Sequence, residues 1–152
     1  MPIKYVTGDA TRPQGPGPKI IVHSVNDLGA WGMGFVLALS KRWPEPEAMY
    51  VGSLTKGAPV LGSVQFVPVT DTITVANLVG QKGLISPTNN TPVKYSAMRT
   101  GLERVASKAK EMKATIHMPR MGCGLGGGTW DKMEPIISET CKGIDVVVYD
   151  LK

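Results

Sequence analysis

The chain has 152 residues, a length typical of a single domain, and 42% hydrophobic content with a mean hydropathy near zero, a composition typical of a soluble globular protein. No apolar run approaches the roughly 20 residues that a membrane helix needs, and the N-terminus reads as a strand rather than a signal peptide, so we expect a cytoplasmic protein without membrane association. Two cysteines exclude a disulfide framework, and a net charge of +5 favours anionic partners such as nucleotides.

Strand and helix patterns alternate along the whole chain. In chain order we expect a strand over 3–6, a buried strand over 19–25, helices over 35–42 and 45–54, strands over 63–69 and 72–79, a helix from 91 or 92 to 112, a strand over 114–118, a helix over 129–141 and a strand over 144–149. Such alternation predicts an α/β layer structure with a mostly parallel or mixed sheet between helices.

Two glycine-rich segments, 29–34 and 122–128, each follow a predicted strand and precede a predicted helix. In α/β sheets ligands bind outside the carboxyl ends of the strands. Glycine lets backbone N–H groups approach an anion, and the next helix N-terminus adds partial positive charge, so two such loops suit a pyrophosphate. The alternative is a set of tight turns that need positive φ. The connection 80–92 is long enough to be a lid or a ligand loop.

Several segments together resemble a known family: Tyr-Val-Thr-Gly-Asp-Ala-Thr over 5–11, His-Ser-Val-Asn over 23–26, the glycine segment 29–35, and Met-Pro-Arg-Met-Gly-Cys-Gly-Leu-Gly-Gly over 118–127 with Trp130 after it. In this order, and over nearly the whole chain, they resemble the macrodomains. The similarity is greatest to the ADP-ribose 1″-phosphate phosphatases and the terminal ADP-ribose glycohydrolases. The resemblance implies a single domain over 1–152, a three-layer α/β/α sandwich with a central mixed sheet.

The resemblance also implies a set of ligand-binding residues. Asp9 would accept the adenine amino group beside Ala10, Asn26 would hold distal-ribose hydroxyls, and Tyr149 would flank the adenine. The remaining expected contacts, to the ribose and the diphosphate, are Gly32, Met33, Gly34, Phe35, Gly122, Cys123, Gly124, Leu125 and Gly126. The alternative for Asp9 is a helix cap, and for Tyr149 a core aromatic at a strand end.

The catalytic pattern of the glycohydrolase branch is interrupted in this chain. Where that branch has a lysine that attacks the ribose, this sequence has Gln81 followed by Lys82, and where it has an acid, this sequence has Gly126. Lys82 would therefore need a shifted position and a lowered pKa to act as the nucleophile. Asp131 is a possible displaced acid, although a carboxylate in the first turn of a helix usually interacts with the helix dipole.

His23 is the other catalytic candidate, because it stands near Asn26, matches the phosphatase branch and could transfer a proton near neutral pH. The alternative is a buried histidine with satisfied hydrogen bonds, which is also our interpretation of His117. No spacing of histidines and carboxylates suits a catalytic metal, and we expect no cofactor.

These observations lead to three functional hypotheses. The first is a monomeric hydrolase that binds ADP-ribose and removes a group from its distal ribose, most simply a 1″-phosphate, with His23 and Asn26 in the site. The second is an ADP-ribosyl glycohydrolase acting on protein or nucleic acid through Lys82 or an activated water. The third is a non-catalytic ADP-ribose reader. Nucleic-acid binding by the basic surface is the least favoured alternative, and no membrane partner is expected.

Overall fold

A six-stranded sheet forms the middle layer of the fold, as seen in a computed structural model that describes residues 3–57 and 59–151. Across the sheet the strands are β1 (Ile3–Thr7), β6 (Val146–Asp150), β5 (Thr115–Met118), β2 (Lys19–Asn26), β4 (Ile73–Gln81) and β3 (Val64–Pro68). Only the edge strand β3 runs antiparallel to its neighbour; all other pairs are parallel. The sheet is therefore mixed, as predicted.

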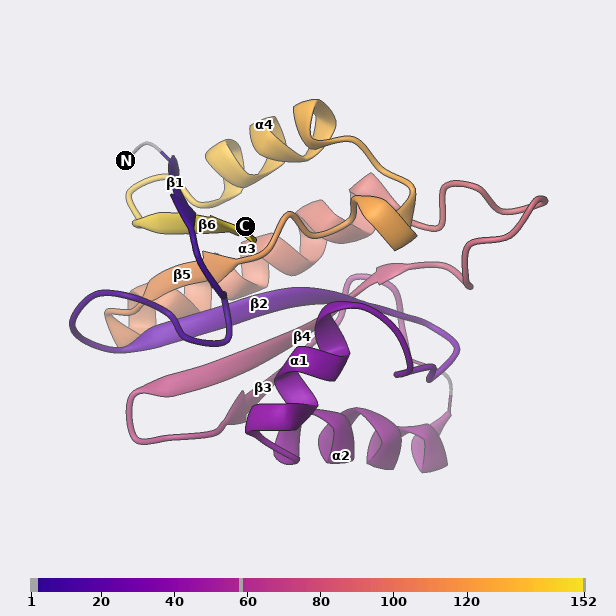
Figure 1. Ribbon diagram of the computed structural model, residues 1–152, viewed down its shortest axis with the longest axis horizontal. Helices are drawn as coiled ribbons and strands as arrows, with labels where there is room; N and C mark the ends of the chain where they lie inside the picture. Colours follow the sequence, from indigo (N-terminus) through magenta and orange to yellow (C-terminus); the bar gives the residue numbers. More distant parts are fainter. Residues whose placement is uncertain (1–2, 58, 152) are drawn as a thin grey trace.

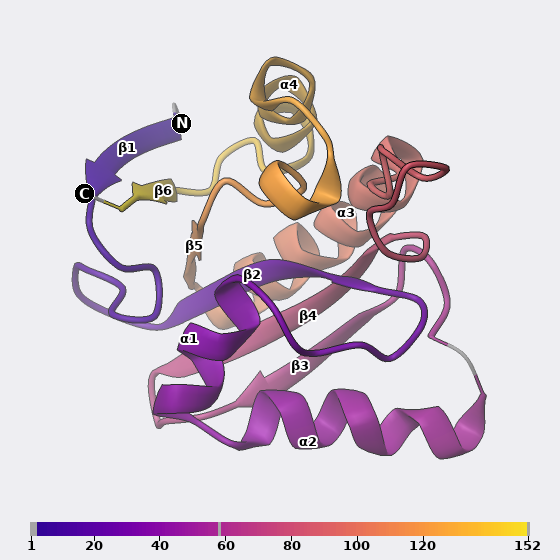
Figure 2. The same ribbon diagram turned by 45° about the vertical axis from the view of Figure 1, so that its right-hand side comes forward.

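Helices cover both faces of the sheet (Figures 1 and 2). On one face lie α1 (Phe35–Arg42), α2 (Glu45–Gly52) and the short 3-10 turn η1 (Ser53–Lys56); on the other lie α3 (Tyr95–Met112) and α4 (Trp130–Thr140). The predicted three-layer α/β/α sandwich is confirmed. None of the helices in the described ranges has the length and apolar character to cross a bilayer.

Strands β2 and β4 are buried because helices cover both of their faces (Figure 2). All residues of β2 except Ser24 are buried, and β4 is buried from Thr74 to Gly80. On α3 the residues predicted as core, Met98, Leu102, Val105 and Ala109, all point inward, while Tyr95 is partly buried. A Cβ at Gly101 would lie 2.4 Å from Leu78, so this glycine allows α3 to approach the sheet closely.

Some predicted boundaries are wrong for identifiable reasons. The long helix begins at Tyr95 rather than at residue 91 or 92, because Val93 forms a bridge with Gln81. Strand β4 continues through Gly80 to Gln81 and α3 begins later than predicted, so the connection between them is shifted by two residues toward the C-terminus rather than changed in length. Thr129 caps α4 with its carbonyl, which accepts from Lys132 and Met133; within the described residues its side chain makes no capping bond.

The chain leaves two neighbouring strands toward opposite faces of the sheet. After β2 it passes to α1 and α2, and after β5 it passes to α4 in the other layer (Figure 2). Parallel sheets bind ligands where the connections diverge in this way, outside the carboxyl ends of the strands. The two glycine-rich segments predicted from the sequence are these two connections.

Candidate functional site

A pocket of about 430 Å³ lies at the carboxyl ends of β2, β4 and β5. Each of these strands contributes the segment that follows it. The pocket is lined by His23, Ser24, Val25, Asn26, Ala30, residues 32–36, Gln81, Leu84, Ile85, residues 119–123, Leu125 and Gly126. Its volume falls within the range of small-molecule sites, roughly 300–1,000 Å³.

Asn26 organises the first glycine loop with its side-chain amide. Its Nδ2 donates to Ala30 O at 2.8 Å, and its Oδ1 accepts from the N–H groups of Leu28 and Ala30 at 3.0 and 3.1 Å. The buried Tyr50 hydroxyl completes the support, since it accepts from Gly29 N at 3.0 Å and lies 2.5 Å from Asn26 O. Asn26 thus holds the loop in place and has one N–H left for the predicted contact with a ligand hydroxyl.

The N-terminus of α1 opens into the pocket. Gly34 is the N-cap at a φ of 80°, where a residue with a side chain would be strained, and it has no side chain to satisfy the first turn. Gly34, Phe35 and Val36 all line the pocket, and the first turn carries no acidic residue. The unpaired N–H groups of a helix start favour an anion, so this end of the pocket is suited to a phosphate.

The second glycine loop packs against the connection that follows β4. A Cβ on Gly127 would lie 2.1 Å from the carbonyl oxygen of Asn90, so only glycine fits there, and Val93 N donates to Gly126 O at 2.9 Å. The same connection is tied to the first loop, because Gly83 N donates to Asp27 Oδ1 at 2.8 Å. The three loops around the pocket therefore form one hydrogen-bonded unit.

His23 is buried at the pocket, with 2% of its surface exposed. Its Nε2 lies 2.6 Å from Asn77 Oδ1. The Asn77 Nδ2 donates to Pro46 O at 3.0 Å and to Gln65 Oε1 at 3.3 Å, which leaves Oδ1 as the acceptor facing the histidine. His23 Nε2 therefore carries the proton, and Nδ1 presents a lone pair that has no hydrogen-bond partner within the described part of the chain.

Burial keeps His23 neutral. Desolvation lowers its pKa from 6.5 to about 4, and the hydrogen bond to Asn77 opposes this shift only in part. Trp31 and Phe35 pack around the ring, with centroids 5.4 and 5.7 Å away. With this lowered pKa the His23 ring is neutral at pH 7, so its Nδ1 can act there as a proton acceptor but not as a proton donor. What the side chain offers at pH 7 is a hydrogen-bond acceptor.

Gln81 and Gly126, the two positions where the resemblance implied a lysine and an acid, are neighbours in space. Gln81 Oε1 lies 3.3 Å from the place that a Cβ on Gly126 would occupy, and both residues line the pocket. A β-bulge at the end of β2 and β4 pairs Asn26 with Gln81 and skips Gly80. Lys82 is exposed and does not line the pocket, so the geometry does not favour it as a nucleophile.

Several other predicted residues lie outside the pocket. Asp9 forms a local turn, in which its Oδ1 accepts from Thr11 N and Oγ1 at 2.8 and 2.7 Å, and it caps no helix. Ala10 is buried beside it, and Gly124 lies beyond the pocket lining. Tyr149 does not flank a surface site, because it is 3% exposed and its hydroxyl contacts Gln14 N and His117 Nδ1, both at 2.8 Å.

The remaining nucleophilic and acidic candidates are not arranged for catalysis. Burial raises the pKa of the Cys123 thiol, which disfavours the reactive thiolate. Asp131 is exposed in the first turn of α4 and does not line the pocket. Within residues 3–57 and 59–151, no group of three His, Cys, Asp or Glu side chains is placed to hold a metal ion.

Sequence reasoning missed several contributors to the site. Tyr50, Leu84, Ile85 and Arg120 all border or support the pocket, yet none was named as a site residue, although Leu84 and Ile85 lie in the connection 80–92 that was predicted as a lid or ligand loop. Arg120 stands inside the segment 118–127 that carried the resemblance, so its position next to the glycine loop was a usable signal. Tyr50 had none, because its contact with Asn26 spans 24 residues of sequence.

Comparisons with known proteins support the interpretation of the fold. The structure is similar to that of a macrodomain protein from Streptomyces coelicolor, with 50% identity, a TM-score of 0.86 and coverage of 97% of this chain and 98% of that one. It is also similar to a Bacteroides thetaiotaomicron protein of unknown function, with 48% identity, a TM-score of 0.95 and 99% coverage of both chains. No family model matches the chain.

Curated relatives include named enzymes. An ADP-ribose 1″-phosphate phosphatase from Candida albicans is 29% identical over 90% of this chain and 92% of its own length. A DNA ADP-ribosyl glycohydrolase from Mycobacterium tuberculosis is 28% identical over 97% of this chain but 42% of its own length. The mouse chromodomain-helicase-DNA-binding protein 1-like is 32% identical over 97% of this chain. The chain spans only 17% of that mouse protein.

The 50% identity to the Streptomyces protein extends over almost the full length of both chains, and both have the same fold. The motifs at the two glycine loops also lie where the family resemblance placed them, around one pocket. The chain belongs to the macrodomain family.

Proposed function

We propose that this protein binds ADP-ribose in the pocket between its two glycine loops and hydrolyses a derivative substituted on the distal ribose. One observation carries the proposal: the open N-terminus of α1 and the two glycine loops meet at a single pocket. Backbone N–H groups and a helix start recognise phosphate without a cationic side chain. The diphosphate would lie between the loops and the distal ribose near His23 and Asn26.

The first candidate substrate is ADP-ribose 1″-phosphate. The Candida phosphatase supports this choice, because its similarity to this chain covers 92% of its own length. In the reaction, water adds to the phosphorus atom, the bond between phosphorus and the 1″ oxygen breaks, and that oxygen takes a proton. The products are ADP-ribose and inorganic phosphate.

Water is the nucleophile that the pocket supports. The neutral His23 lines the pocket with a buried Nδ1 whose lone pair would accept a proton from a bound water, and Gln81 offers an amide that orients water by donating and accepting hydrogen bonds. Ser24 Oγ is also buried without a partner among the described residues and lines the same pocket. A lysine-linked intermediate is not part of this proposal, because Lys82 lies outside the pocket.

The apolar mouth of the pocket favours a second candidate, removal of ADP-ribose from a larger molecule. Met33, Leu84 and Leu125, one from each loop, are 69%, 50% and 43% exposed around the opening. Such side chains suit a bulky leaving group with an apolar surface better than a dianionic phosphate. The mycobacterial DNA ADP-ribosyl glycohydrolase is a relative with that kind of activity in its name.

The test is calorimetric titration with ADP-ribose, with AMP and NAD as controls, followed by phosphate release from ADP-ribose 1″-phosphate on the same sample. Binding with release supports the phosphatase. Binding without phosphate release leaves a glycohydrolase or a reader without activity. Release of ADP-ribose from ADP-ribosylated protein or DNA would indicate the glycohydrolase, and no release would indicate the reader. Absence of ADP-ribose binding would overturn the proposal.

A further inference from the structure

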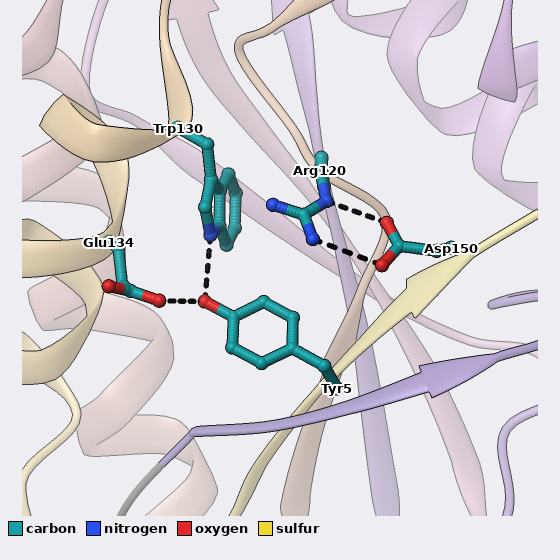
Figure 3. A network of polar contacts seen from close by, with 5 residues as sticks. All are labelled: Tyr5, Arg120, Trp130, Glu134 and Asp150. Carbon is teal, nitrogen blue, oxygen red and sulfur yellow. Dashed lines mark hydrogen bonds and ion pairs between the residues drawn. The ribbon is translucent and has the colours of Figure 1, made fainter.

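A cluster of five side chains stands beside the pocket, where β1, β6, α4 and the second glycine loop meet (Figure 3). Tyr5 Oη accepts from Trp130 Nε1 at 2.7 Å and donates to the Glu134 carboxylate. Arg120 Nε and Nη2 donate to the two oxygens of Asp150 at 2.6 and 3.0 Å. The cluster joins segments that are as far apart in sequence as β1 and α4.

The Arg120 guanidinium is fixed in one orientation by its surroundings. Asp150 pairs with it through two bonds, and its Cζ lies 5.1 Å from the Tyr5 ring centroid and 5.2 Å from that of Trp130. The two rings stand at 79° to each other, and both lie beside the guanidinium (Figure 3). The side chain is nevertheless 40% exposed, which leaves part of the group open to a ligand.

The ion pair with Asp150 also determines which kind of ligand the Arg120 guanidinium can bind. The carboxylate of Asp150 offsets the charge of Arg120 and, at the same time, holds its plane. A guanidinium in this state is a rigid planar surface more than a free cation. A planar aromatic ring therefore fits it better than a second anion, since a guanidinium stacks on aromatic faces through its plane as well as its charge.

The position of Arg120 connects two parts of the molecule. It is the only arginine or lysine that lines the pocket within the described part of the chain. Its partner Asp150 accepts from Gly8 N at 2.8 Å through its backbone oxygen, so the cluster leads from the pocket to the turn at the end of β1. Tyr149, the aromatic predicted to flank a base there, faces the interior. Arg120 thus presents a planar group at this rim of the pocket.

We propose that the guanidinium of Arg120 is a stacking surface for the nucleobase of a nucleotide whose phosphates occupy the glycine-loop pocket. The location of the phosphates rests on the proposed function. Asp150, Tyr5 and Trp130 are positioning residues in this arrangement, because they hold the guanidinium and leave its open side to the base.

The test compares ligands with and without a base. Wild type, Arg120→Ala and Arg120→Lys are titrated with ADP-ribose, AMP and ribose 5-phosphate, with NMR shifts for the weak ligands. Both variants are expected to lower the affinity for ADP-ribose and AMP by about tenfold and to leave the affinity for ribose 5-phosphate unchanged. Lysine keeps the charge of Arg120 but not its planar group, and alanine keeps neither. Asp150→Asn is expected to produce part of the same selective loss.

The matched control is Arg99→Ala, which removes an exposed arginine paired with Glu139, 2.8 Å away, at a place that does not line the pocket. It should bind all three ligands as wild type does. Full affinity in Arg120→Lys would overturn stacking and indicate that the charge of Arg120 is what binds. An equal loss of affinity for ribose 5-phosphate would also overturn stacking and indicate that Arg120 contacts the phosphate. Selective, Arg120-dependent binding of AMP without binding of ADP-ribose would defeat the proposed function but keep the stacking surface. Binding of neither ligand by wild type would overturn both.

Discussion

The two histidines of this chain are equally buried and differ in a single hydrogen bond. His23 is 2% exposed and His117 is 1% exposed, and burial lowers the pKa of both to about 4. His117 has partners for both ring nitrogens, Thr115 Oγ1 at 2.7 Å and Tyr149 Oη at 2.8 Å. His23 has a partner for Nε2 alone among the described residues, and its Nδ1 is left over.

That difference separates a histidine whose ring nitrogens are both paired within the fold from a pocket-lining histidine with one nitrogen unpaired among the described residues. A buried polar atom without a partner is costly, and native proteins rarely retain one unless water, an ion or a ligand satisfies it. His117 is complete within the fold. Among the described residues nothing pairs with the buried Nδ1 of His23, so burial alone is a poor guide to its role.

The largest expected effect is on stability, and it tests the lowered pKa that the two histidines share. Unfolded histidine has a pKa near 6.5 and the folded groups one of about 4, so between these values the unfolded chain binds more protons. Stability is therefore full above pH 6.5 and is lost as the pH falls toward 4, by up to roughly 3 kcal/mol for each histidine. Urea unfolding at pH 7.0 and 4.5 measures this loss.

NMR titration of the histidine ring protons provides the independent check, because it needs no variant. Both rings should stay neutral down to about pH 4. A midpoint near 6.5 for either histidine would contradict the burial that the structure assigns to it.

The next effect is on kcat, and it tests the unpaired Nδ1 that distinguishes His23 from His117. His23→Ala is expected to lower kcat on the active substrate by about 100-fold, because it removes the acceptor at the reacting water. His117→Gln, the matched change of a histidine outside the pocket lining, should leave the kcat of the folded enzyme unchanged. The wild-type rate should also stay flat between pH 8 and 5, since His23 does not titrate there.

Thermal melting of both variants separates lost activity from lost folding. The comparison fails if His117→Gln reduces kcat as much as His23→Ala while both remain folded. A fall in rate through pH 6.5 would assign proton transfer to a different group.

The smallest effect concerns two adjacent residues, Gln81 in the pocket and Lys82 outside it. Gln81→Ala is expected to lower kcat by about tenfold, because orienting a water contributes less than accepting its proton. Lys82→Ala should have no effect on kcat. A large loss in Lys82→Ala, or a lysine adduct detected by mass spectrometry after borohydride trapping, would restore the covalent mechanism.

Local sequence signals determined most of the fold. The β-branched run of β2, the apolar spacing along α3 and the glycine segments after two strands are properties of neighbouring residues, and all three correspond to the elements observed. Helix and strand periodicity depend on burial of one face, which a short stretch of sequence records directly. The placement of both glycine loops at one edge of the sheet follows from the same pattern.

The tertiary structure alone decided the roles of individual side chains. Which ring nitrogen of His23 carries the proton depends on Asn77, 54 positions away, and the hydroxyl of Tyr149 pairs with Gln14 and His117. Whether Gln81 or Lys82 faces the pocket depends on a bulge where β2 and β4 pair. Hydrogen bonds and desolvation act between groups that folding brings together, so the sequence defined where a ligand site lies, whereas three-dimensional packing defined which groups can act in it.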